Sequence, residues 1–361
     1  MAKKARMTNR ERVESLLRRE KPDRVPNLPY APMGFSMIYT GKTIGEAYGN
    51  PKLSYEAQKQ THADFDWVFI PVICHGAFGA SEYGGEIKLP SGEFSQAPTV
   101  VKNPIEKPED VYKIKVPDDI KTAGWMPILM EFMQYAAAEQ LDNEPFNVTA
   151  LCGMGPFSTH ANLLGVGNTV KLMLKNPDIV NHLLSVGADF HIAMAKAFKE
   201  AFGTKTALPH IGEPCASNNI LSPKQFEEFV MPCLKKVCDA CIDMGFKHLL
   251  AHICGEHNEN LPYWAKISWG DPGLISLPHE IDILKGAEYF PDDIIVGNLE
   301  PAILQMETPD NVYEATKKIV EKGKSLKQGY IFSQGCELPP KTPLENIKAM
   351  NQAVEDCGWY D

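Results

Sequence analysis

The sequence predicts an α/β protein built as a (β/α)8 TIM barrel, because short β-type runs alternate with helical patterns. Eight such runs occur, at residues 25–30, 67–73, 146–152, 206–211, 246–252, 273–277, 294–298 and 330–333. No Gly-x-Gly-x-x-Gly motif follows the first run, which argues against a doubly wound sheet. A chain of 361 residues is a common length for one barrel, so we expect a single domain over residues 1–361.

A helical extension is expected before the barrel. It begins at Thr8-Asn9-Arg10-Glu11, a capping-box pattern, and continues to Arg19. Residues 74–124 are rich in glycine and proline and lack a clear period, so we expect an insertion there that covers the barrel mouth as a lid. The remaining helical patterns lie between the β-type runs, at residues 169–184, 188–202, 223–244, 283–290, 310–322 and 343–356.

The composition is that of a soluble globular protein of enzyme size, with 44% hydrophobic and 23% charged residues. A formal net charge of −10 argues against nucleic acid or an anionic membrane as the partner. The nine cysteines are scattered without the spacing of a disulfide framework. No signal peptide and no apolar run of about 18 residues is present. We therefore expect a cytoplasmic protein.

The strongest chemical signal is His252-x-Cys254 at the end of the fifth β-type run, together with Cys336 just after the eighth. One imidazole and two thiolates form a ligand set that selects zinc over magnesium or calcium. Three protein ligands leave one coordination position open, as in catalytic zinc sites. The alternative is that Cys254 and Cys336 are ordinary buried thiols.

Other residues follow the predicted strands and would share the active face of a barrel. Glu213, His279 and Glu280 are candidate acids, and one of the carboxylates could fill the open zinc position; His257 is a further candidate acid, and Glu213 could instead cap a helix. Asn298 and Trp264 are candidate contacts for a cofactor or substrate. Asn298 could also form a turn, and Trp264 could equally belong to the core.

The chain resembles the uroporphyrinogen decarboxylase superfamily, specifically its zinc-containing, corrinoid-dependent methyltransferase branch. The resemblance is carried by residues 8–26, by Ala251-His252-Ile253-Cys254-Gly255, by Val296-Gly297-Asn298 and by residues 335–346. It implies that His252, Cys254 and Cys336 bind Zn²⁺. Decarboxylase activity is disfavoured, because the expected substrate-binding arginines are missing from residues 31–35 and the expected carboxylate from residues 69–73.

The resemblance further implies methyl transfer between a small molecule and the cobalt of a cobalamin. No Asp-x-His-x-x-Gly motif is present, so the corrinoid would be supplied by a partner protein.

Two directions of methyl transfer are open. The favoured one is demethylation of a methoxylated aromatic compound, because residues 256–273 and the insertion are long and suit a large substrate. The alternative is methylation of a thiol such as coenzyme M. A non-enzymatic zinc or corrinoid-binding module is a third reading, and the oligomeric state, a homodimer included, is left open.

Overall fold

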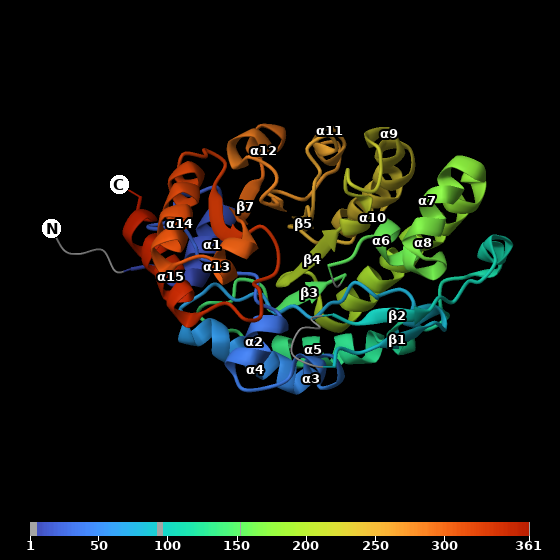
Figure 1. The fold of residues 1–361 in the computed structure, drawn as a ribbon, viewed down its shortest axis with the longest axis horizontal. Coiled ribbons are helices and arrows are strands. Elements are labelled where there is room, and N and C mark those ends of the chain that lie inside the picture. Colours follow the sequence, from blue (N-terminus) through green and yellow to red (C-terminus); the bar gives the residue numbers. More distant parts are fainter. Residues whose placement is uncertain (1–5, 92–96, 152, 361) are drawn as a thin grey trace.

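A computed structural model describes residues 6–91, 97–151 and 153–360 and shows a parallel sheet surrounded by helices (Figure 1). The six strands of this sheet follow one another in chain order, each hydrogen-bonded to the next. They are β3 (Val148–Ala150), β4 (Ala207–Gly212), β5 (Leu250–His252), β6 (Leu274–Ser276), β7 (Ile294–Leu299) and β8 (Tyr330–Gln334).

The first two predicted runs, residues 25–30 and 67–73, are extended segments and not regular strands, which corrects the prediction of eight strands. Asn27 nevertheless pairs with Phe332 of β8 in parallel, and the Val68 N–H donates to the Asn27 carbonyl at 2.7 Å. On the other side, the Thr149 hydroxyl of β3 donates to the Pro71 carbonyl at 2.6 Å. The two segments therefore close the sheet between β8 and β3. Their prolines lack the N–H that a regular ladder needs. The predicted barrel is confirmed.

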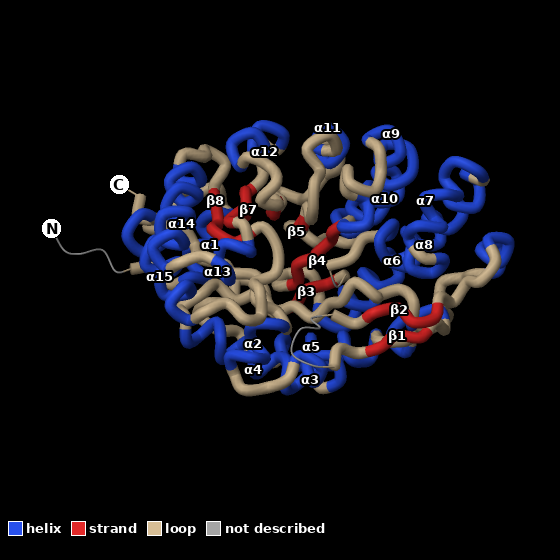
Figure 2. Tube along the Cα trace, in the orientation of Figure 1, coloured by secondary structure: helices blue, strands red, loops and turns tan. Residues whose placement is uncertain are grey.

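Helices enclose this sheet, as Figure 2 shows. The predicted N-terminal helix is present as α1 (Asn9–Leu17), with the capping box at Thr8 and Glu11. The predicted helices at 169–184 and 188–202 instead divide at Asn176, because Pro177 begins a new helix that then runs unbroken to Phe202. The other helices are α2 (Gly34–Tyr39), α3 (Ile44–Gly49), α4 (Pro51–Asp64), α5 (Met126–Ala137), α6 (Pro156–Leu164), α7 (Val166–Lys175), α8 (Pro177–Phe202), α9 (Pro223–Gln225), α10 (Met231–Asp243), α11 (Leu261–Trp264), α12 (Ile283–Tyr289), α13 (Pro301–Met306), α14 (Pro309–Lys324) and α15 (Leu344–Cys357).

Two hydrophobic clusters follow from the alternation of side chains along the strands. The smaller cluster fills the barrel interior and includes Leu208, Leu250 and Val296. The larger one lies between the strands and the surrounding helices, where it includes Leu249 and Ala251, the neighbours of Leu250. Side chains at the inward-facing positions near the strand ends therefore line the barrel interior, and the candidate site lies among them.

The expected insertion forms an antiparallel hairpin, β1 (Glu86–Lys88) and β2 (Thr99–Lys102), with short 3₁₀ turns. It packs beside the barrel opening, since the Ile105 N–H donates to the Leu163 carbonyl of α6 at 3.0 Å. Residues 92–96 of the insertion lie outside the described residues. Within the described chain, no helix is long and apolar enough to cross a membrane.

Candidate metal centre

Three side chains from two distant parts of the chain meet at the carboxyl ends of the strands. His252 is the last residue of β5, Cys254 follows two positions later, and Cys336 lies two positions after β8. Their ligand atoms all lie within 4.8 Å of one another, and the two sulfur atoms are 3.7 Å apart. Among the described residues, no further His, Cys, Asp or Glu ligand atom joins this cluster.

The strand arrangement orients the imidazole of His252. In the ladder between β5 and β6, His252 is paired with Ser276, and its Nδ1 lies 3.1 Å from the Ser276 hydroxyl. A hydrogen bond at one ring nitrogen leaves the other free to bind a metal. Gly335 allows the end of β8 to approach closely, since a Cβ there would lie 2.6 Å from the His279 backbone nitrogen.

The residues fit a zinc ion. One imidazole and two thiol groups are zinc donors, and a three-ligand set leaves one position for an exogenous ligand. The pKa of the Cys336 thiol is lowered by the hydrogen bond from Cys254, against burial, and His252 lowers it further. The same hydrogen bond raises the pKa of Cys254, with burial and the charges of Cys336 and Glu280 acting in the same direction.

Glu213, predicted as an acid or a helix cap, occupies the capping position. It is fully buried, and its carboxylate accepts the N–H groups of Phe157 at 3.0 Å and Ser158 at 2.7 Å, in the first turn of α6. Burial raises the pKa of Glu213 to about 7, although the hydrogen bonds from Ser158 and Phe157 act in the opposite direction. The carboxyl group thus holds the start of α6 beside the site and does not belong to the ligand cluster.

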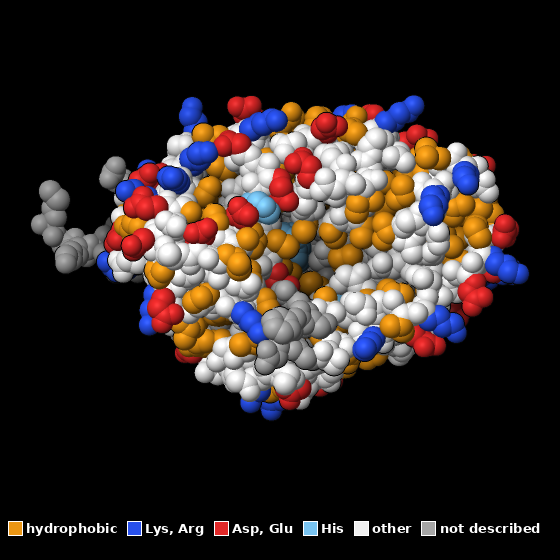
Figure 3. Space-filling view, viewed as in Figure 1, with side chains coloured by type: hydrophobic (Ala, Val, Ile, Leu, Met, Phe, Trp, Pro, Cys, Tyr) orange, Lys and Arg blue, Asp and Glu red, His pale blue; other side chains and the backbone are white. Residues whose placement is uncertain are grey.

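His279 and Glu280 lie at the rim of the opening. The His279 Nδ1 is 3.2 Å from a Glu280 carboxylate oxygen, and both residues are solvent-exposed. The charge of Glu280 acts on Cys254, which indicates that the pair lies close to the metal ligands. Figure 3 shows acidic and histidine side chains around the hollow in the middle of this face.

Asn298 and Trp264 take structural positions. The Asn298 side-chain amide donates to the carbonyls of Pro278 at 2.9 Å and Ile281 at 2.7 Å, so it holds the loop that carries His279 and Glu280. Trp264 is fully buried in the hydrophobic core, which is the alternative position that the sequence left open for it. Its ring is stacked on Trp269 at 5.6 Å, and its indole N–H donates to His257.

Sequence reasoning missed four residues beside the ligands: Tyr30, Cys74, His210 and Glu337. The Tyr30 hydroxyl lies 3.4 Å from the Cys74 sulfur, and the Tyr30 ring is 5.6 Å from that of His252. The His210 ring is 5.8 Å from His252, and burial together with the charge of His252 lowers the pKa of His210 to about 3. Burial raises the pKa of Cys74 to about 12, and the charge of Glu337 raises it as well. The signal that could have found Tyr30 and Cys74 is their place at the end of the first two β-type runs.

Comparison with known proteins gives one result for the family and one for the enzyme class. The chain is 27% identical over 355 residues, 97% of its length and 98% of the relative's, to the methylcobamide:CoM methyltransferase of Methanosarcina acetivorans. It is 26% identical to the uroporphyrinogen decarboxylase of Anaeromyxobacter dehalogenans, but only over 139 residues, 38% of each chain. A solved structure, a methyltransferase from Methanosarcina mazei, matches 97% of this chain and 99% of its own with a TM-score of 0.80 at 24% identity, which supports the barrel fold.

The predicted enzyme class, a methyltransferase, is confirmed by the relatives that match the chain over nearly its whole length. The family model for uroporphyrinogen decarboxylase matches residues 8–357. The chain therefore belongs to the uroporphyrinogen decarboxylase family.

Proposed function

We propose that the protein is a zinc-dependent methyltransferase that exchanges a methyl group between a small molecule and the cobalt of a separate corrinoid protein. The observation that carries the proposal is the open cluster of His252, Cys254 and Cys336 at the carboxyl ends of the strands. Relatives that match the chain at full length are methylcobamide:CoM methyltransferases, which supports the corrinoid partner.

The residues of the chain have separate roles in this proposal. His252, Cys254 and Cys336 would hold zinc, which when bound activates a heteroatom, by lowering the pKa of a thiol or polarising the oxygen of a methyl ether. Ser276 fixes the imidazole of His252. His279 and Glu280 form the one predicted acid pair that is solvent-exposed beside the ligands, and we assign to it the proton exchange with the heteroatom. Glu213 positions α6.

For the direction of transfer, we favour demethylation of a methoxylated aromatic compound. The surroundings of the ligand cluster are acidic, since Glu280 acts on Cys254 and Glu337 acts on Tyr30 and Cys74. Coenzyme M carries a permanently charged sulfonate, and such an anion is disfavoured near carboxylates. A phenol ether carries no such charged group beside its methylated oxygen.

Methylation of a thiol is the second candidate. It is favoured by the relatives, four of which are named methylcobamide:CoM methyltransferases and match 97% of this chain. The same ligand cluster would serve either direction, because zinc binds sulfur and oxygen ligands alike.

A paired assay tests the proposal and its direction. Zinc-loaded protein is mixed with cob(I)alamin and an uncharged methoxyphenol in one reaction, and with methylcobalamin and coenzyme M in the other. We expect the absorption spectrum of methylcobalamin to appear in the first reaction. Loss of methylcobalamin in the second reaction alone would establish the thiol direction, and no change in either would contradict methyl transfer.

The Cys336→Ala variant is the matched test of the ligand assignment. We expect it to lose zinc and methyl transfer while it melts close to the metal-free form of the unchanged protein. Cys357→Ala removes another half-buried thiol, at the end of α15, and this variant should keep both zinc and methyl transfer. A Cys336→Ala protein that keeps its metal and melts as a destabilised variant would show that Cys336 is only a packing residue.

A further inference from the structure

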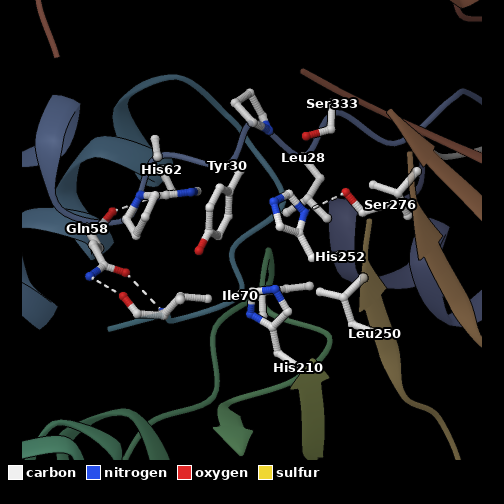
Figure 4. A pocket seen from close by; sticks show the side chains of 15 residues that line it. Leu28, Tyr30, Gln58, His62, Ile70, His210, Leu250, His252, Ser276 and Ser333 are labelled. Carbon is white, nitrogen blue, oxygen red and sulfur yellow. Dashed lines mark hydrogen bonds between the residues drawn. The ribbon is translucent and has the colours of Figure 1, made fainter. Parts of the chain in front are cut away.

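Beside the metal ligands, the barrel interior holds a small cavity of about 40 Å³ (Figure 4). Its wall is mostly apolar, with Leu28, Ile70, Val72, Leu250 and Val296 contributing aliphatic side chains. Figure 4 shows the rings of Tyr30, His62, His210 and His252 around its centre. His252 is thus shared between the cavity and the proposed metal centre.

One polar side chain on this wall lacks a partner. His210 is 1% exposed, and neither of its ring nitrogens has a hydrogen-bond partner among the described residues. The other buried histidine of the wall is satisfied, because His62 Nδ1 lies 2.8 Å from the Gln58 carbonyl. Leaving a buried polar group without a hydrogen-bond partner is energetically costly. His210 is therefore arranged to meet a group that enters the cavity.

The position of the cavity indicates which part of a substrate would reach it. Methyl transfer is an in-line displacement, so the corrinoid and the heteroatom of the substrate lie on opposite sides of the methyl carbon. A corrinoid on a separate protein can approach only from the barrel opening. The heteroatom then faces the barrel interior, and the chain attached to it continues past His252 toward the cavity.

We propose that this cavity, with His210 as its hydrogen-bonding residue, binds a short uncharged polar tail of the methyl-carrying molecule. The inference rests on the proposed function, because it places the heteroatom at the zinc ligands. His210 in its neutral form offers one donor and one acceptor, and the hydroxyl of Tyr30 offers both as well. A hydroxyl group would satisfy His210, and two or three heavy atoms fit the volume. This volume is well below the roughly 150 Å³ that holds benzene, so the ring of an aromatic ether would lie outside the cavity and only a short substituent on it would enter.

The cavity is unsuited to an anionic tail. None of the described residues that line it is lysine or arginine. A sulfonate or carboxylate placed there would lose its hydration without gaining a cation, which is strongly unfavourable. The nearby carboxylate of Glu337, whose charge acts on Tyr30, would also repel an anionic tail. Selection between tails is therefore expected to depend on charge first and on the His210 hydrogen bond second.

Binding of three thiols to the zinc-loaded protein, measured by titration calorimetry, tests this inference. Ethanethiol, 2-mercaptoethanol and 2-mercaptoethanesulfonate share one head group and differ in the tail. We expect 2-mercaptoethanol to bind at least about tenfold more tightly than the sulfonate. In His210→Phe, which keeps a ring but removes its nitrogens, 2-mercaptoethanol should lose about tenfold in affinity. Ethanethiol should bind that variant as well as before.

Two further variants keep the result interpretable. His210→Asn restores a donor and an acceptor and should recover part of the lost affinity. His182→Phe replaces a histidine of α8 that also has an unpaired nitrogen but packs on Tyr112, away from the cavity, and should change nothing. Zinc content should be equal in all four proteins, because Ser276 and not His210 holds His252.

Failure of the cavity to bind the tail and failure of the protein to transfer methyl groups give different results in these experiments. A protein that holds zinc and transfers methyl groups, yet binds the sulfonate as tightly as the alcohol or is unaffected by His210→Phe, overturns the role of the cavity alone. A protein that holds no zinc and binds none of the thiols overturns the proposed function and this inference with it.

Discussion

Glu213 is a carboxyl group that the fold buries completely beside the metal ligands. It accepts two backbone N–H groups from the first turn of α6, at Phe157 and Ser158. Negative charge is favourable at a helix N-terminus, but burial acts against the charged form and dominates, so the pKa of Glu213 is raised to about 7. The residue is therefore expected to change its charge near neutral pH.

Replacing Glu213 with glutamine should flatten the pH dependence of stability. A carboxyl group whose folded pKa lies above its unfolded value favours folding most below pH 4.5, and this contribution is lost as the pH rises through about 7. The loss amounts to about 3 kcal/mol at full ionisation. Urea unfolding of the unchanged protein and of Glu213→Gln, at pH 5 and pH 8, measures it.

The comparison is made between the two proteins at each pH, so that proton release from the metal ligands cancels. We expect the unchanged protein to lose more unfolding free energy than Glu213→Gln between the two pH values. An equal loss in both proteins would mean that Glu213 has an ordinary pKa and that its burial does not control its charge.

At the level of single residues, the sequence identified the ligand cluster but not its neighbours. The short spacing of His252 and Cys254 places both at one strand end, and Gly335-Cys336 follows another strand. His210 could not be found in this way, because every residue of β4 is buried and no alternation of polar and apolar residues marks its inward face. Only the closed barrel shows that His210 faces His252.

Pairing of neighbouring strands fixes the geometry of the candidate site. His252 of β5 lies opposite Ser276 of β6, and the Ser276 hydroxyl lies 3.1 Å from Nδ1 of the His252 ring. Groups that orient a metal ligand in this way typically contribute 10- to 100-fold to metal affinity. The register between two strands thus becomes a determinant of zinc binding.

Ser276→Ala is expected to weaken zinc binding by about 10- to 100-fold without loss of the fold. Competition with a colorimetric zinc chelator measures the affinity. Ser333→Ala is the matched control, since Ser333 is also a buried serine at the end of a strand and lines the same cavity, but on β8. Equal zinc affinity in Ser276→Ala and the unchanged protein would contradict the orienting role of the hydroxyl.

At the level of elements, the sequence predicted the alternation of strands and helices well, and the boundaries of these elements less well. Proline explains both corrections. Pro26, Pro29 and Pro71 lie in the first two β-type runs and lack the donors for regular ladders, so those runs close the barrel as irregular segments. Pro177 begins α8 and shifts the predicted helix boundary, whereas Gly187 lies inside α8 without ending it.

The whole molecule is expected to fold without a metal. Its two hydrophobic clusters, inside and outside the ring of strands, involve residues along nearly the full chain. A chain of 361 residues buries enough apolar surface to be stable on its own. Zinc would then act as a ligand of the folded protein and not as a condition for folding.

Removing zinc with a chelator should leave the far-ultraviolet circular dichroism spectrum unchanged and the thermal transition cooperative. The midpoint of the transition should move to a lower temperature, because the free energy of unfolding loses the contribution of zinc binding. This contribution is about 4 kcal/mol when zinc is present at 1,000 times its dissociation constant. Loss of secondary structure on chelation, as in zinc-finger domains, would instead identify a structural metal.

X-ray absorption spectroscopy of the zinc-loaded protein tests the central claim, an open site with three protein ligands, most directly. We expect two sulfur ligands at about 2.3 Å and nitrogen or oxygen ligands at about 2.0–2.1 Å. Adding 2-mercaptoethanol should raise the sulfur count by one, because the thiol enters the open position. Four protein ligands that do not change on addition of the thiol would contradict an open site at His252, Cys254 and Cys336.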